Sequence, residues 1–178
     1  PMQWAIDGGT SVNVENIQNA DIMSQWGYSY EREMLVFQEL RQSEARDRRA
    51  LENHLKPIIA APPEYLTVNR KGQHPYQALN RLFVLAFSNE SIPITLPSDD
   101  RRWFVVRSSA GRMGLGEGKQ MFDWYHAGGF ACIAAWLHAR DVSAFNPGES
   151  PFMTDAKSIM IESGMSGAES FLTELMRN

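Results

Sequence analysis

The chain has 178 residues and a formal net charge of −4, and 43% of its residues are hydrophobic. This length and composition allow one sizeable core and predict a globular, soluble protein. The acidic balance excludes nucleic-acid binding through overall charge, so any such contact must come from a local basic patch. No apolar stretch reaches the roughly 20 residues of a membrane span, and the first residues lack a signal-peptide pattern. The single cysteine, Cys132, predicts a reducing, cytoplasmic setting, and its apolar neighbours place it in the core.

The N-terminal 30 residues are polar, and we expect them to be loosely structured apart from a short helix around residues 21–26. The continuous apolar run at residues 34–37 then predicts a buried strand. Gln38 and Glu39 come directly after this strand. The pattern therefore predicts polar groups at the carboxyl end of a buried strand.

A helix is predicted over residues 41–59. Leu51, Leu55 and Ile58 recur at steps of four and three residues, which is the spacing of one helix face. The prolines at positions 57, 62 and 63 are expected to close the helix.

The next segment has the pattern of one arm of a β-hairpin. Leu66 and Val68 alternate with polar residues and lead into Arg70, Lys71 and Gly72. The hairpin would therefore have a basic tip, and a turn or short helix is expected over residues 74–80.

Residues 81–107 carry the strongest signal. The apolar run at residues 82–87 ends on Ser88 and Asn89, and a loop with two prolines leads into a second apolar run at residues 103–106. That second run is preceded by Asp99, Asp100, Arg101 and Arg102. Two buried strands are predicted, and because open α/β sheets hold ligands at strand ends, the polar residues indicate an anionic ligand.

The C-terminal third is predicted to be helical. Four glycines without hydrophobic periodicity mark residues 111–119 as a linker between a lobe of residues 1–110 and a helical domain of residues 120–178. Helices are expected along the Phe130 to Leu137 stripe, from residue 154 or 155 to 163, and after a capping box formed by Ser166 and Glu169. Residues 114–120 look like a phosphate loop but lack its first glycine and its hydroxyl residue, so they are interpreted as linker.

Taken in order, the strand ending in Glu39, the helix, the basic hairpin, the Ser-Asn strand and the paired arginines resemble part of a known motor. The resemblance is to the C-terminal half of the motor domain of superfamily 3 helicases, found in phage and plasmid primase-helicases, and it covers roughly residues 20–107. It implies an α/β fold, a partial AAA+-like P-loop NTPase sheet without its phosphate-loop half, followed by a small helical domain. The tail from Arg140 to Lys157 is also similar to the segment after this motor in such phage proteins.

The resemblance implies a role for each motif. Glu39 would activate the water that attacks ATP and take part in holding Mg²⁺, Asn89 would sense the γ-phosphate, and Arg101 or Arg102 would act on a neighbouring subunit's nucleotide. Gln38 and Ser88 would lie at the nucleotide, with Gln38 replacing an acid that the family usually has there, which predicts weaker Mg²⁺ binding. The DNA contacts would come from Arg70, Lys71, Gly72 and His74.

Each motif also has a plain structural interpretation. Glu39 can be an exposed residue after a core strand, and Asn89 can cap a turn. Arg101 and Arg102 can form ion pairs with Asp99 or Asp100, and the basic hairpin tip can simply be solvated.

Nothing in residues 1–30 supplies the Gly-rich phosphate loop that such a motor needs. We therefore expect little or no ATPase activity from the chain alone, and either a fragment of a longer primase-helicase or a split or decayed prophage product. In the intact protein the predicted activity is ATP-driven unwinding of DNA, with single-stranded DNA as partner and a homo-oligomeric ring as assembly. The alternatives are a non-enzymatic module that binds DNA or assembles with partners and, more remotely, an unrelated metabolic α/β enzyme.

Overall fold

The computed structural model describes residues 13–24, 30–41, 44–59, 64–146, 148–165 and 175. Its contacts divide the chain into a helical unit, residues 1–14 and 108–148, and a strand-bearing unit, residues 15–107 and 149–178. The capping box predicted at Ser166 and Glu169 lies outside the described residues. Within the described part, every helix is too short or too polar to cross a bilayer.

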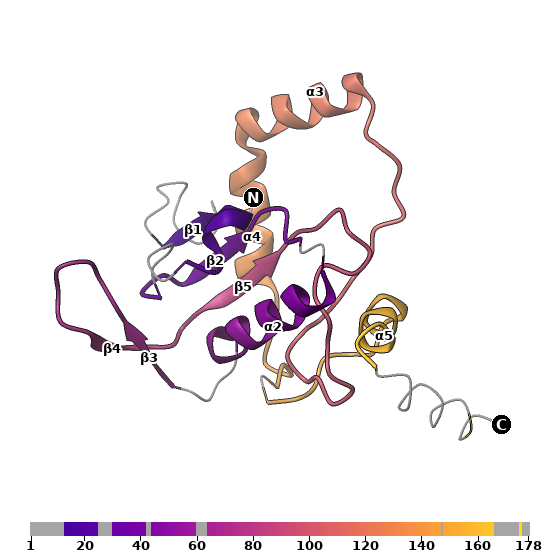
Figure 1. The fold of residues 1–178 in the computed structure, drawn as a ribbon. Helices are drawn as coiled ribbons and strands as arrows, with labels where there is room; N and C mark the ends of the chain where they lie inside the picture. Colours follow the sequence, from indigo (N-terminus) through magenta and orange to yellow (C-terminus); the bar gives the residue numbers. More distant parts are fainter. Residues whose placement is uncertain are drawn as a thin grey trace. The chain divides into compact units, whose positions relative to one another are not determined.

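A three-stranded sheet with the order β1-β2-β5 forms the centre of the strand-bearing unit (Figure 1). The strands are β1 (Val14–Ile17), β2 (Met34–Phe37) and β5 (Phe83–Ala86). β2 and β5 run parallel, with Phe37 opposite Ala86. β2 is buried at all four positions, which confirms the strand predicted from its continuous apolar run.

The segment predicted to be loosely structured contributes a strand and a short helix instead. β1 lies within it, and a 3-10 helix, Asn19–Asp21, follows. The helix predicted at residues 21–26 is not formed at residues 22–24, and its last two positions lie outside the described residues. Val14 and Ile17 are buried although two polar residues separate them, so β1 lacks a long apolar run. Its pairing in the sheet, which the sequence alone does not display, explains why the strand was missed.

Helix α2 (Ala45–Ile59) confirms the predicted helix and its buried face. Leu51, Leu55 and Ile58 lie in one core cluster with Leu35 and Phe37 of β2. Pro57 lies inside the helix, contrary to our expectation that it would end it. Burial of the residues on either side, Leu55 and Ile58, outweighs the local cost of the proline.

The predicted hairpin is present as a separate two-stranded sheet (Figure 1). β3 (Tyr65–Val68) pairs antiparallel with β4 (Tyr76–Leu79), and Val68 lies opposite Tyr76. The turn or short helix predicted over residues 74–80 is therefore wrong at residues 76–79, which form β4. Gly72 at the tip has a φ of +79°, a conformation that favours glycine.

The second strand predicted in the arginine segment is not formed. Residues 101–114 have no regular secondary structure. Trp103 and Val105 pack against the core, whereas Phe104 is 57% exposed and Val106 71% exposed. The burial of the segment alternates as in a strand, but no described strand pairs with it and two of its four apolar side chains are exposed, so the predicted second buried strand is wrong.

The helical unit contains α3 (Leu115–Trp124) and α4 (Phe130–Ala139), joined by a π-helical segment, Tyr125–Gly129. The second half of the predicted linker, residues 115–119, forms the start of α3. The Glu117 carboxylate accepts a hydrogen bond from the Gly114 N–H at 3.0 Å, which caps the helix. Cys132 is exposed, so its predicted place in the core is wrong.

Helix α5 (Asp155–Glu162) begins after Thr154, as predicted. We expected it to belong to a separate helical domain. Instead, Met160 and Ile161 join the core cluster that contains Phe37 and Leu51. Helix α5 is therefore part of the strand-bearing unit.

Candidate functional site

The carboxyl ends of β2 and β5 lie at one edge of the sheet, which we call the strand-end edge: residues 38–39 and 87–89. The parallel register ends with Phe37 opposite Ala86, so β2 and β5 end at the same level of the sheet. The Phe87 N–H donates to the Phe37 carbonyl at 3.0 Å, and the Leu40 N–H donates to the Phe87 carbonyl at 2.7 Å. The structure thus brings the two predicted motifs together.

Gln38 is held by β1. Its backbone N–H donates to the Ile17 carbonyl at 2.9 Å, and its Nε2 donates to Asn16 Oδ1 at 3.1 Å. The sequence reasoning missed Asn16, because β1 itself was not predicted. The only signal in the sequence was the pair of apolar residues, Val14 and Ile17, on either side of Glu15 and Asn16.

Glu39 has a left-handed backbone conformation, with φ of +51°, and it is exposed. Non-glycine residues adopt this conformation rarely, at a cost of about 1–2 kcal/mol. Such strain gathers at functional sites and persists where the surrounding structure enforces it. The tight connection from β2 into Leu40 imposes the positive φ of Glu39. This φ turns the chain where it leaves β2 at the strand-end edge.

Ser88 and Asn89, the polar residues of the edge after β5, differ in their hydrogen bonding. Ser88 Oγ accepts a hydrogen bond from the Glu90 N–H at 3.0 Å, so it stabilises the turn after β5. Asn89 is exposed, and its side chain makes no hydrogen bond with any residue that the structure describes. The turn-capping role considered for Asn89 is therefore performed by Ser88.

The predicted arginines differ in exposure. Arg101 is exposed, whereas Arg102 is half-buried and its Nε is buried without a hydrogen-bond partner among the described groups. Neither arginine pairs with Asp100, whose carboxylate instead contacts Lys157 Nζ at 2.9 Å. The ion-pair interpretation of the arginines is wrong for Asp100, and no described hydrogen bond or ion pair links the arginines to the strand-end edge.

At the hairpin tip, one basic residue forms an ion pair and the others are exposed without one in the described part of the chain. The Arg70 guanidinium forms an ion pair with Glu31 and lies 6.0 Å from the centre of the Tyr76 ring. Partial burial, and then a hydrogen bond to Glu31, raise the pKa of Tyr76 above its ordinary value. Lys71 and His74 are exposed. They are the tip groups that can reach a ligand without breaking a described contact.

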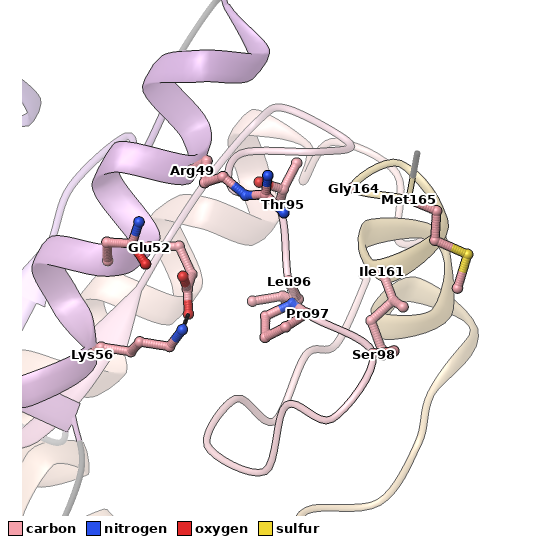
Figure 2. Close-up of a pocket in the computed structure, with 11 residues that line it drawn as sticks. Arg49, Glu52, Lys56, Thr95, Leu96, Pro97, Ser98, Ile161, Gly164 and Met165 are labelled. Atoms are coloured by element: carbon pink, nitrogen blue, oxygen red, sulfur yellow. Dashed lines mark ion pairs between the residues drawn. The ribbon is translucent and has the colours of Figure 1, made fainter. Parts of the chain in front are cut away.

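A pocket of about 540 Å³ lies elsewhere in the strand-bearing unit, between α2, residues 95–98 and the end of α5 (Figure 2). Arg49 and Lys56 line its helical wall, and Lys56 Nζ is 3.2 Å from Glu52 Oε1. None of the catalytic, nucleotide-binding or DNA-binding residues predicted from the sequence lines this pocket. The pocket and the predicted chemistry are therefore in different places, and we base the site on the strand-end edge.

The donors at the strand-end edge permit only a limited metal site. Across the described residues, no three His, Cys, Asp or Glu side chains are grouped as metal ligands would be. Mg²⁺ is commonly held by one or two carboxylates together with substrate phosphates. Glu39 and the Gln38 amide oxygen fit such a shared site, and they do not fit a cage made by the protein alone.

Comparison with known proteins supports the fold. Residues 5–102 match the family described as "Family of unknown function (DUF5906)". An apo structure of the C-terminal region of NrS-1 superposes with a TM-score of 0.76 at 21% identity, over 98% of this chain and 42% of that one. A second, the A form of the same region, gives a TM-score of 0.68 at 22% identity, over 93% and 39%. The chain thus spans about two fifths of these structures, and no curated protein matches its sequence.

Proposed function

Because the chain belongs to DUF5906, a family of unknown function, we propose its role from its own residues: it is part of a replicative motor that unwinds DNA by hydrolysing ATP. In this proposal the chain supplies the catalytic glutamate, the sensor asparagine and the arginine that acts on a neighbour. The similarity to the C-terminal region of NrS-1 is a similarity of fold, and the motor function, including the AAA+-like and superfamily 3 assignments, is our inference.

The observation that carries the proposal is the parallel pairing of β2 with β5. It places Glu39 and Asn89, which are 50 positions apart in the chain, after neighbouring strands at the same edge. Strand ends of this kind are where open α/β sheets hold ligands. The positive φ of Glu39 adds support, because residues with strained backbone gather at functional sites.

The two side chains have complementary chemistry. The Glu39 carboxylate would orient the attacking water and take its proton, and the Asn89 amide would donate a hydrogen bond to that water or to the γ-phosphate. Asn16 holds the Gln38 amide nitrogen and so leaves the amide oxygen of Gln38 available to a cation. Phosphoryl transfer depends mainly on positioning and charge stabilisation, which are the contributions that these residues can make.

Between the two arginines, the structure favours Arg101 as the group that reaches a neighbouring subunit. Arg101 is exposed and has no ion-pair partner among the described residues, whereas Arg102 is half-buried. A guanidinium that stabilises transferring phosphate must approach it directly. Arg102 is therefore expected to support the loop.

The test is a subunit-mixing experiment with the complete product of the gene that encodes this chain. Glu39→Gln and Arg101→Ala variants should each lose at least about 100-fold in the rate of ATP hydrolysis. Mixing the two inactive variants should restore activity, because some interfaces then combine an intact Glu39 with an intact Arg101. Arg102→Ala is the matched control and should lose less. If the mixture stays inactive while each variant mixed with native protein assembles normally, the trans role of Arg101 is wrong.

Single-stranded DNA is the proposed partner of the hairpin tip. Lys71→Ala should weaken binding of a labelled single strand in fluorescence anisotropy and reduce the slope of log K against log salt by about 0.7, the contribution of one phosphate contact. Arg70→Ala should have a smaller effect, because Arg70 is already paired with Glu31. Gln73→Ala alters the same tip without removing charge and should leave the slope unchanged. An unchanged slope in Lys71→Ala would contradict the hairpin contact.

A second candidate is a module that binds DNA or assembles with partners without ATP. It is favoured by the hairpin, which forms its own sheet and exposes Lys71 and His74 independently of the strand-end edge. This function predicts DNA binding that Lys71→Ala weakens and Glu39→Gln does not, together with no hydrolysis of ATP by the complete gene product.

A further inference from the structure

Helix α5 carries a lysine that is completely enclosed by the strand-bearing unit. The side chain of Lys157 is 1% exposed, and that of its partner, Asp100, is 0% exposed. Lys157 Nζ donates to Asp100 Oδ2 at 2.9 Å and to the Asp100 backbone carbonyl at 2.9 Å. The ammonium group thus binds both the side chain and the backbone of the residue that immediately precedes Arg101.

Asp100 in turn shapes the chain after it. Its Oδ2 accepts hydrogen bonds from the backbone N–H of Trp103 at 3.0 Å and of Arg102 at 3.3 Å. These bonds close a turn of four residues with Arg101 inside it. The direction of the Arg101 side chain therefore depends on the orientation of the Asp100 carboxylate, and Lys157 holds that carboxylate in place.

Helix α5 contacts the same loop at two further points. Thr154 Oγ1 donates to the Val105 carbonyl at 2.6 Å and accepts from the Lys157 N–H at 3.1 Å as the helix cap. On the other side of the turn, the Leu96 N–H donates to the Met160 carbonyl at 3.5 Å. The loop is thus attached to α5 before, within and after the arginine turn.

A fully buried ion pair is a costly way to join two elements. Desolvation of two charges often exceeds their attraction, and apolar residues of similar volume would stabilise the fold as well or better. Here Asp100 Oδ1 even remains buried without a described hydrogen-bond partner. Stability is therefore a poor explanation for the pair, and fixing one conformation of the loop is a better one.

We propose that Lys157 is a positioning residue for Arg101: through Asp100, it fixes the turn from which Arg101 would reach the nucleotide of a neighbouring subunit. This inference rests on the proposed function for its catalytic consequence. Its structural part, that Lys157 orders the arginine turn, stands independently.

The structural part is tested by amide hydrogen exchange on this chain. The variant is the double change Asp100→Asn with Lys157→Met, which removes both charges, leaves no buried charge unpaired and keeps an oxygen at position 100 to accept the turn bonds. Exchange at Arg102 and Trp103 should become at least about tenfold faster, because the acceptor becomes a neutral amide oxygen that Lys157 no longer orients, and exchange in β2 should be unchanged. Lys119→Met, which removes an exposed lysine, is the control. Unchanged exchange at Arg102 and Trp103 would overturn the inference.

The catalytic part is tested by ATP hydrolysis in the complete gene product. The double variant should lower kcat about as much as Arg101→Ala does, leave the KM for ATP within about twofold, and add little to Arg101→Ala when combined with it. A folded double variant with native kcat would overturn the positioning role. If Arg101→Ala itself has native activity, the proposed function fails instead, and the ordering of the turn by Lys157 is still decided by hydrogen exchange.

Discussion

Replacing Lys157 alone by methionine should lower the free energy of unfolding of the strand-bearing unit by about 3–5 kcal/mol. The reason is the Asp100 carboxylate, which would remain 0% exposed without its cation. Adding Asp100→Asn should recover most of this loss, to within about 1 kcal/mol of the native chain, because the neutral pair carries no desolvated charge. Denaturant unfolding followed by circular dichroism measures both variants.

The matched control is the same substitution at an exposed ion pair. Lys119 Nζ lies 2.6 Å from Asp123 Oδ2, and the two side chains are 77% and 63% exposed. Lys119→Met should change the free energy of unfolding by no more than about 0.5 kcal/mol. If Lys157→Met lowers the free energy of unfolding by less than about 1 kcal/mol, Lys157 and Asp100 do not form a buried ion pair.

Substitution of Glu39 should separate activity from stability. Glu39→Gln should slow ATP hydrolysis by the complete gene product by about 10²–10⁴-fold, because the amide cannot take a proton from water. Its stability should equal that of the native chain, since the strained φ of +51° is retained. Nucleotide binding should also be retained, and this distinguishes a lost catalytic group from a disrupted fold.

Glu39→Gly is the companion variant. Glycine adopts positive φ without strain, which offsets its greater flexibility in the unfolded chain. The variant should therefore be as stable as the native protein or more stable by up to about 1 kcal/mol, and as inactive as Glu39→Gln. If Glu39→Gly is clearly less stable than the native chain, the Glu39 side chain stabilises the fold, and its role is structural.

Several features were predictable because they depend on local pattern. The buried strand of residues 34–37, the helical face with Leu51 and Leu55, the hairpin with its basic tip and the helix capped by Thr154 were all confirmed. In each case the apolar spacing, or a residue suited to a cap or turn, lies within a few positions. Such signals survive folding because they match the period of the element itself.

The failures have a common physical origin in contacts between distant residues. β1 exists because it pairs in the sheet, and the second half of the hairpin is a strand because it pairs with β3. The segment from Trp103 to Val106 alternates as a strand would, yet it is anchored through Thr154. Helix α5 was assigned to another domain because its spacing does not indicate which core receives Met160 and Ile161.

By itself, the sequence determined the types of chemistry: a glutamate after a buried strand, a serine and an asparagine after a second, only partly buried strand, two arginines after a proline loop and a basic hairpin tip. Only the tertiary structure decided how these groups are arranged. The parallel register of β2 and β5 places Glu39 and Asn89 at one edge. The ion pair between Lys157 and Asp100 takes the place of an ion pair between Asp100 and either arginine, and Arg101 is exposed. Residue identity is local, whereas burial and register depend on contacts between residues far apart in the chain, and a linear pattern does not specify them.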